Sequence, residues 1–109
     1  NGSQIRDFVY VKDVVQANIM ALESNVESVF INIGPGKTIS ILELANQIVK
    51  SSKLKLNLIH QNALKGDVME SKADVSLAKK LLNWEYKIEL NDWLDDTVPI
   101  LLKNKKEPL

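Results

Sequence analysis

The sequence predicts a small α+β domain of about four helices and three short strands. Four segments carry apolar residues at three- and four-residue steps, which is the spacing of amphipathic helices. Three shorter runs are rich in β-branched and aromatic or alternating apolar residues and predict strands. These strands are too few and too scattered for a doubly wound nucleotide-binding half, which needs three parallel strands with helices between them.

The first third of the chain predicts a strand, a helix and a second strand. Residues 8–11 (Phe-Val-Tyr-Val) predict the first strand, and a helix is expected over about residues 12–23. Asp13 lies near the start of this helix, where the helix dipole favours a negative charge. Residues 28–33 (Ser-Val-Phe-Ile-Asn-Ile) predict a buried strand that ends at the turn signal Gly34-Pro35-Gly36.

A second helix and a third strand are expected in the middle of the chain. Ser40 and Glu43 have the spacing of a capping box, and the apolar residues that follow continue at helical spacing. Residues 54–59 alternate apolar residues with lysine and asparagine, which predicts a half-exposed strand. Residues 60–72 carry little apolar content and are expected to be irregular.

Two more helices are predicted in the last third. Asp74 caps a short helix that runs to Leu82, and Asn83 follows where a helix often needs a left-handed residue. Trp84 is expected to pack back on the end of that helix. The last helix spans about residues 90–103 and contains Pro99, which should kink or split it because proline lacks a backbone N–H.

Composition excludes several classes of function. The 109 residues include 14 Lys and Arg and 14 Asp and Glu, so the formal net charge is zero. A neutral chain lacks the basic surface of a nucleic-acid binder and is not attracted to an anionic membrane. The absence of cysteine excludes disulfides and thiolate zinc sites. No apolar run approaches the ~20 residues that a bilayer requires, so a cytoplasmic domain is expected. The chain begins at Asn1 rather than Met, as if cut from a longer protein.

The segment around Gly36-Lys37-Thr38 partly matches the sequence pattern of a phosphate-binding loop. The full nucleotide-binding pattern requires a glycine five residues before this Gly-Lys pair, and that position is Ile31. The dinucleotide-binding pattern fails as well, because its third glycine would fall at Ile39. The expected structure is therefore an ordinary turn followed by a capped helix.

Other polar and aromatic residues favour structural interpretations. Spacing alone indicates a surface ion pair for Arg6 and Asp7, although an arginine fork can also clamp a diphosphate. His60 has no nucleophile or metal partner at useful spacing. Trp84 and Trp93 are expected to pack against helices. No nucleophile has an adjacent base, so the chain has no catalytic centre of its own. Acidic residues near the last helix predict a solvated face rather than a metal site: Glu89, Asp92, Asp95 and Asp96.

Several stretches taken together resemble a known enzyme family. The stretches 2–15 (Gly-Ser-Gln-Ile-Arg-Asp-Phe-Val-Tyr-Val-Lys-Asp-Val-Val), 30–37, 66–68 and 73–84 follow one another with natural spacing. In this order they resemble the last part of extended short-chain dehydrogenases/reductases that act on nucleotide sugars. Asn83 stands where that family usually has a glycine. The branch most similar to this chain is the NAD-dependent epimerases such as UDP-glucose 4-epimerase.

The resemblance implies that residues 1–109 are the C-terminal, substrate-binding part of an α/β (Rossmann-type) enzyme whose N-terminal Rossmann domain is absent. That domain would hold NAD and the catalytic residues, so no catalytic, cofactor-binding or metal-binding residue is expected here. The partners implied are a nucleoside diphosphate-sugar and the Rossmann domain, within a homodimeric parent enzyme. The parent would oxidise the sugar C4 hydroxyl with NAD, let the keto sugar rotate, and return the hydride to the other face.

The resemblance also assigns five substrate contacts. Arg6 would meet the diphosphate or the uridine, and Phe8 would sit beside the nucleotide. Asn32 would line the same pocket, and Ile41 would pack near the base. Asp67 would accept a hydrogen bond from a ribose hydroxyl.

One position departs from the family pattern, and two alternatives stay open. A second diphosphate-clamping arginine is usual where Leu64 stands, and the adjacent Lys65 is a point charge that cannot replace a guanidinium fork. The chain could instead belong to a dehydratase or reductase of the same superfamily, or be a non-catalytic interaction module. Phe8 stands where the dehydratases tend to carry Trp, and no His separates Gly66 from Asp67, which favours an epimerase.

Overall fold

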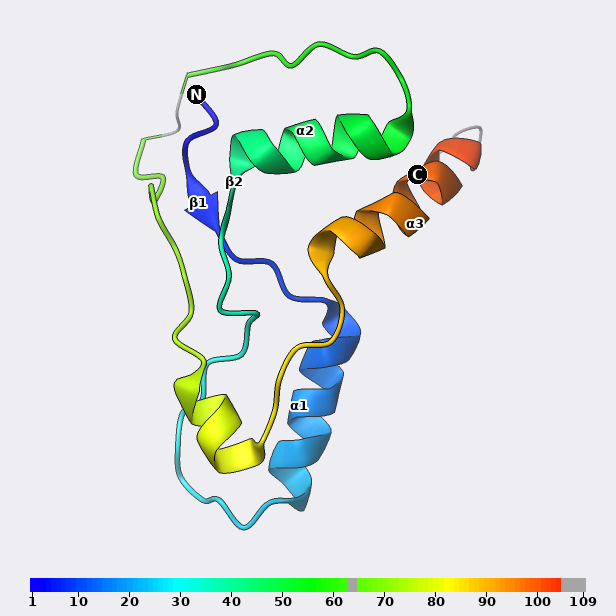
Figure 1. Cartoon of the computed structure of the whole chain (residues 1–109). Helices are drawn as coiled ribbons and strands as arrows, with labels where there is room; N and C mark the ends of the chain where they lie inside the picture. The colour runs from blue at the N-terminus through cyan, green and yellow to red at the C-terminus, as the bar shows by residue number, and fades with distance from the viewer. Residues whose placement is uncertain (63–64, 105–109) are drawn as a thin grey trace.

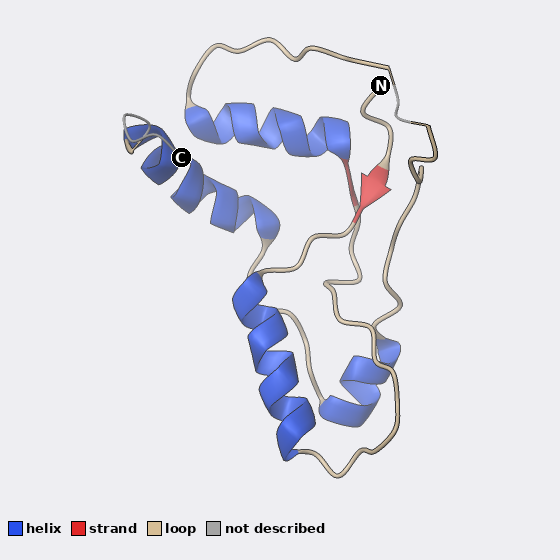
Figure 2. Cartoon of the chain, turned by 180° about the vertical axis from the view of Figure 1, so that it is seen from behind, coloured by secondary structure: helices blue, strands red, loops and turns tan. Residues whose placement is uncertain are grey.

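Four helical segments and two very short strands make up the computed structural model, which describes residues 1–62 and 65–104. Helices α2 and α3 pack against each other in one half of the molecule, and α1 lies beside η1 in the other half (Figure 1). The small sheet sits next to the start of α2, close to the N-terminus (Figure 2). In chain order the elements are β1 (Ile5–Arg6), α1 (Val11–Glu23), β2 (Ile39–Ser40), α2 (Ile41–Ser52), the π-helical turn η1 (Ala78–Leu82) and α3 (Leu90–Lys103).

The main hydrophobic core lies between α1 and η1. It consists of four buried side chains, with partly buried apolar residues around them. Ala17 comes from α1, Ala78 and Leu82 from η1, and Trp84 from the segment after η1. The small alanines let the two backbones approach closely, and the indole of Trp84 fills the space that remains. Trp84 therefore packs against a helix, as predicted.

Asp13 ties the start of α1 to the segment that leads into α3. Its backbone carbonyl accepts a hydrogen bond of 2.9 Å from Nε1 of Trp84. Its carboxylate accepts two more, from the backbone N–H groups of Lys87 (3.1 Å) and Ile88 (3.0 Å). The residue is only 6% exposed, and these donors compensate for the loss of water around its charge.

The start of α2 is fixed by the capping box that the sequence predicts. The Ser40 hydroxyl accepts from the backbone N–H of Glu43 at 3.0 Å, and the Glu43 carboxylate accepts from the backbone N–H of Ser40 at 3.4 Å. At the other end of this helix, the buried Ser51 donates to Oδ1 of Asp95 on α3 at 2.7 Å. This polar contact and the adjoining apolar faces hold α2 against α3.

The four predicted helices are present and confirm the α+β class, with two local differences. The segment expected to be helical from Asp74 is helical from Ser76, and its last turn is π-helical. Asn83 adopts the expected left-handed conformation, with φ of 54°. Of the kink or split expected at Pro99, the split is wrong, because α3 continues through Pro99 to Lys103. One missing backbone bond does not break a helix that packs along α2.

The three predicted strands are wrong in position. Residues 8–11, 28–33 and 54–59 contain no strand, and the last residue of the first run already begins α1. The sheet is formed instead by β1 and β2, which pair antiparallel with Ile5 opposite Ser40. A β-branched composition favours an extended backbone, but a strand also needs a neighbouring strand to pair with. Within the described residues, none of these three runs pairs with a strand.

Candidate functional site

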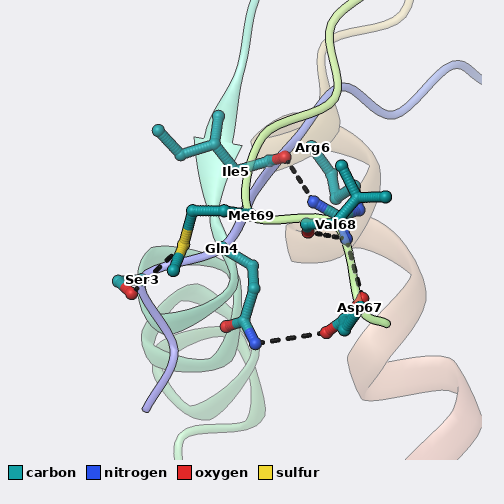
Figure 3. Close-up of polar contacts among 7 residues, drawn as sticks. All are labelled: Ser3, Gln4, Ile5, Arg6, Asp67, Val68 and Met69. Carbon is teal, nitrogen blue, oxygen red and sulfur yellow. Dashed lines mark hydrogen bonds and ion pairs between the residues drawn. The ribbon is translucent and has the colours of Figure 1, made fainter. Parts of the chain in front are cut away.

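The structure brings Arg6 and Asp67 together across 61 positions of sequence (Figure 3). Residues 69–71 run beside β1: the backbone N–H of Ile5 donates to the carbonyl of Met69 at 2.7 Å, and the backbone N–H of Ser71 donates to the carbonyl of Ile5 at 2.9 Å. This alignment places Nη2 of Arg6 at 3.1 Å from Oδ1 of Asp67. The two side chains therefore form an ion pair at the edge of the small sheet.

Gln4 completes the surroundings of the Asp67 carboxylate. Its Nε2 donates to Oδ2 of Asp67 at 3.2 Å, so each carboxylate oxygen faces one donor (Figure 3). Gln4 directly precedes β1 and Arg6 ends it, and both side chains donate to the same carboxylate. Sequence reasoning missed Gln4, because only the fold shows that its side chain lies beside a residue 63 positions away.

The guanidinium of Arg6 is partly engaged and partly available. Nη1 donates to the carbonyl of Ile5 at 2.8 Å, and Nη2 donates to Asp67 and to the carbonyl of Val68. A guanidinium has five N–H donors, so these contacts to described residues use three and leave two for a ligand. The side chain of Arg6 is 25% exposed, which leaves its fixed charge accessible from one side. The arrangement suits an anion that approaches Arg6 while the protein holds it in place.

The surface pair expected between Arg6 and Asp7 is not formed. Oδ2 of Asp7 accepts instead from the backbone N–H of Ala73 at 3.0 Å. The carboxylate partner of Arg6 is Asp67. Arg6 and Asp7 therefore each hold one end of the segment 67–73 against the start of the chain.

A cleft of about 290 Å³ opens beside Asp67 and contains Ile41. Gln4 lies in its wall, and the backbone carbonyl of Gln4 accepts from the N–H of Ile41 at 2.8 Å. The first turn of α2, the residues before β1 and the segment 58–62 therefore meet around one hollow. Its apolar lining beside a carboxylate is the kind of surface that binds a flat ring with a polar edge.

Three of the five expected contact residues are not part of the lining of this cleft, and of these Arg6 adjoins it through its ion pair with Asp67. Phe8 lines one hollow with Tyr10 and Trp93 and a second one with Tyr86. Asn32 is exposed on the extended segment before Gly34. Leu64, where the family pattern has its second arginine, lies outside the described residues. The structure thus gathers Arg6, Ile41 and Asp67, and the contact roles of all five remain predictions.

A larger hollow lies away from these residues. It measures about 840 Å³ and is lined by the turn 34–36, residues 72–76 and residues 84–87. Lysines and acids alternate around it, and Lys79 pairs with Glu85 at 2.6 Å. Since these charges offset one another, we place the candidate site at the smaller cleft, which Asp67 lines and whose neighbour Arg6 is paired with that carboxylate.

Lys37 does not form a phosphate cradle. Its Nζ lies 2.8 Å and 3.1 Å from the two carboxylate oxygens of Glu89, and 5.3 Å from the centre of the Tyr86 ring. The lysine is thus already paired, and Gly36 has the positive φ of a turn. Both facts agree with the turn predicted from the sequence.

The Lys37–Glu89 pair gives a testable pH dependence. The hydrogen bond from Lys37, followed by one from Tyr86, lowers the pKa of the Glu89 carboxyl from its ordinary value. Because the pKa of Glu89 is lower in the folded protein, the pair stabilises the fold fully at pH values above the ordinary pKa of a glutamate. This contribution is lost as the pH falls through the lowered pKa. A carbon-detected NMR titration should find the pKa of Glu89 below the ordinary value of a glutamate carboxyl.

The matched control for this titration is Lys37→Gln, which removes the charge and leaves a polar side chain one atom shorter. The pKa of Glu89 should rise in that variant. An unaltered Glu89 titration would show that the pair does not persist in solution.

The remaining polar residues point to no other chemistry. His60 is exposed and borders the cleft beside Asp67. Asp95, one of the acidic residues near α3, accepts hydrogen bonds from Ser51 and Gln47 on α2 and so has a structural role. In residues 1–62 and 65–104, no group of three side chains could hold a metal ion, and no helix could cross a membrane.

Comparison with known proteins places the chain in a family. Residues 1–34 match the model of the NAD dependent epimerase/dehydratase family. A UDP-glucuronate 4-epimerase of Thermodesulfobacterium geofontis is 37% identical over 99 residues, which cover 90% of this chain and 30% of that protein. The structure of UDP-glucose 4-epimerase from Thermotoga maritima with UDP-glucose superposes with a TM-score of 0.86 at 34% identity, over 98% of this chain and 34% of that one.

The chain belongs to this epimerase/dehydratase family. A UDP-glucuronic acid 4-epimerase of Bacillus cereus, solved with UDP-glucuronic acid and NAD, superposes with a TM-score of 0.80 at 29% identity, over 93% of this chain and 34% of that one. The chain spans about a third of the length of the relatives it matches. Family membership and fold therefore agree with the resemblance seen in the sequence.

Proposed function

We propose that this chain binds the nucleoside diphosphate-sugar in an NAD-dependent nucleotide-sugar 4-epimerase. The observation that carries the proposal is the Arg6–Asp67 pair beside a cleft that contains Ile41. Structural relatives solved with UDP-glucose and with UDP-glucuronic acid support this class of ligand. Because those relatives are about three times as long, the reaction itself belongs to the whole protein.

The three gathered residues suit three parts of such a ligand. The spare N–H donors of Arg6 would neutralise and orient the diphosphate. The apolar side chain of Ile41 would pack on the base within the cleft. The Asp67 carboxylate, held at both oxygens by Arg6 and Gln4, would accept from a ribose hydroxyl through a remaining lone pair.

The described residues do not fit NAD. The only glycine turn before a helix has one residue between its glycines, and its lysine is paired with Glu89. The cofactor would be held by the remainder of the protein, where it would supply the hydride acceptor and donor. This chain would contribute binding and orientation of the sugar nucleotide, and would position the sugar at the edge that faces the remainder.

A titration of the whole protein with UDP-glucose tests the proposal, with amide chemical shifts as the readout. We expect saturable shifts at Gln4, Arg6 and Asp67 and at the first turn of α2, and none at the far end of α3. UMP should reproduce the shifts near Ile41 but not those of Arg6, because it lacks the diphosphate. Product analysis then separates the branches, since a dehydratase leaves a 4-keto-6-deoxy sugar and an epimerase does not.

The proposal fails if no saturable shift occurs near Arg6 and the whole protein neither binds NAD nor alters any UDP-sugar. Saturable binding without any product would instead favour the non-catalytic interaction module.

A further inference from the structure

The carboxylate plane of Asp67 is set by two donors from one short segment. Nη2 of Arg6 donates to Oδ1 of Asp67 at 3.1 Å, and Nε2 of Gln4 donates to Oδ2 at 3.2 Å (Figure 3). With one donor alone the carboxylate could still turn about its Cβ–Cγ bond, because this torsion is broad in aspartate. A donor at each oxygen fixes the plane, so the contact from Gln4 is the one that stops this rotation.

The backbone around Gln4 is held from two sides. Its carbonyl accepts a hydrogen bond of 2.8 Å from the N–H of Ile41 at the start of α2. The N–H of the next residue, Ile5, donates to the carbonyl of Met69 at 2.7 Å. These bonds fix the main chain of Gln4 relative to α2 and to the segment that follows Asp67. The side-chain amide therefore reaches the carboxylate from a fixed point.

Glutamine is chemically suited to this position. Gln4 is half-buried and lines the cleft beside Asp67. Arg6 already supplies one positive charge next to the carboxylate. The amide of Gln4 donates to the second oxygen without adding a charge, so it orients the carboxylate and leaves the charge of the ion pair unchanged.

A carboxylate held in this way has an acceptor for each hydroxyl of a vicinal diol. An ionised carboxylate offers about four lone-pair positions on its two oxygens. Among the described residues, Arg6 and Gln4 use one position on each oxygen, and the side chain of Asp67 is still 37% exposed. The two hydroxyls of a ribose could each donate to one oxygen, whereas a 2′-deoxyribose has only one hydroxyl to offer. The second contact depends on the plane staying fixed.

We propose that Gln4 is a positioning residue, which holds the Asp67 carboxylate in the plane that accepts both ribose hydroxyls. The chain would then prefer ribonucleotides to 2′-deoxyribonucleotides. This inference rests on the proposed function, because it takes Asp67 as the acceptor of the ribose. It adds the class of nucleoside and the residue that enforces the preference. Gln4 acts through Asp67 and takes no part in the chemistry at the sugar.

Calorimetric titration of the whole protein with UDP and with 2′-deoxy-UDP tests the positioning role. The wild-type protein should bind UDP on the order of 10-fold more tightly, the effect of one hydrogen bond to a charged group. Gln4→Glu keeps the shape of the side chain but replaces the donor by a second carboxylate, and should reduce this preference to about 2-fold or less. Gln4→Met removes the donor without adding a charge and should reduce the preference as well.

Gln47→Glu is the matched control. Nε2 of Gln47 donates to Oδ1 of Asp95 at the same distance of 3.2 Å, but this contact joins α2 to α3 and neither residue lines the cleft. The variant therefore introduces the same repulsion between carboxylates away from the ligand. It should leave the preference for UDP unchanged, even where its Tm falls as far as that of Gln4→Glu.

The outcomes separate this inference from the proposed function. A wild-type protein that binds neither nucleotide refutes both. Equal affinity of the wild-type protein for the two nucleotides, or a wild-type preference in the folded Gln4 variants, overturns the positioning role alone. So does unfolding of both Gln4 variants, or an equal loss of affinity for both nucleotides, because each is the effect of a purely structural contact.

Discussion

Replacement of Trp84 by alanine is expected to lower the free energy of unfolding by about 3–5 kcal/mol, the cost of removing a buried aromatic side chain. The effect should be large because the described core contains few other buried side chains, and two of those are alanines. The substitution also removes the hydrogen bond from the indole to the carbonyl of Asp13. Urea denaturation followed by circular dichroism measures the loss.

Two further variants separate packing from hydrogen bonding. Trp84→Phe keeps most of the apolar volume and loses the N–H, so it should cost only about 1–2 kcal/mol. Trp93→Ala removes a half-buried ring that contacts Tyr10 outside this core, and should cost less than Trp84→Ala. Equal losses for both alanine variants would contradict a core centred on Trp84.

Replacement of Arg6 by alanine is expected to weaken binding of UDP-glucose to the whole protein by about 10- to 100-fold, the range for losing a charge-assisted hydrogen bond or two. Arg6→Lys should lose nearly as much, because an ammonium cannot reproduce the planar fork that contacts Asp67 and Val68 and still presents donors to a diphosphate. Isothermal titration calorimetry measures both affinities.

Lys37→Gln is the matched control for this prediction. It removes a cation of the glycine turn that lies outside the cleft, so the affinity for UDP-glucose should not change. The melting temperature of Arg6→Ala must also be recorded, since Arg6 holds the segment at residues 67–68 in place. Wild-type affinity in a folded Arg6→Ala protein would exclude Arg6 from the diphosphate site.

The helices could be predicted because their signals are local. The capping box at Ser40 and Glu43, the left-handed Asn83 and the spacing of apolar residues are all read within a few positions of the residue concerned. Pro99 is the exception, because its effect depends on how strongly α3 packs against α2. Local pattern alone does not contain that information.

The strands and half of the site depend on distant partners. Residues 28–33 have the composition of a buried strand, yet their backbone pairs with no described residue. Arg6 and Asp67 were both identified through the family resemblance, and the fold then showed that they touch. Gln4 carries no motif and became visible only through its contact with Asp67. Spacing along a sequence cannot reveal a contact that the fold makes across more than 60 residues.

Asp13 has a mechanical consequence for the candidate site. Through its carbonyl and carboxylate it anchors the segment 84–88, which leads directly into α3, to the first turn of α1. Only a short extended stretch separates that turn from Arg6 on β1. The position of the arginine is therefore set from both directions, by β1 on one side and by this anchor on the other. The buried carboxylate of Asp13 thus links the packing of α1 and α3 to the position of Arg6, the residue proposed to bind the ligand.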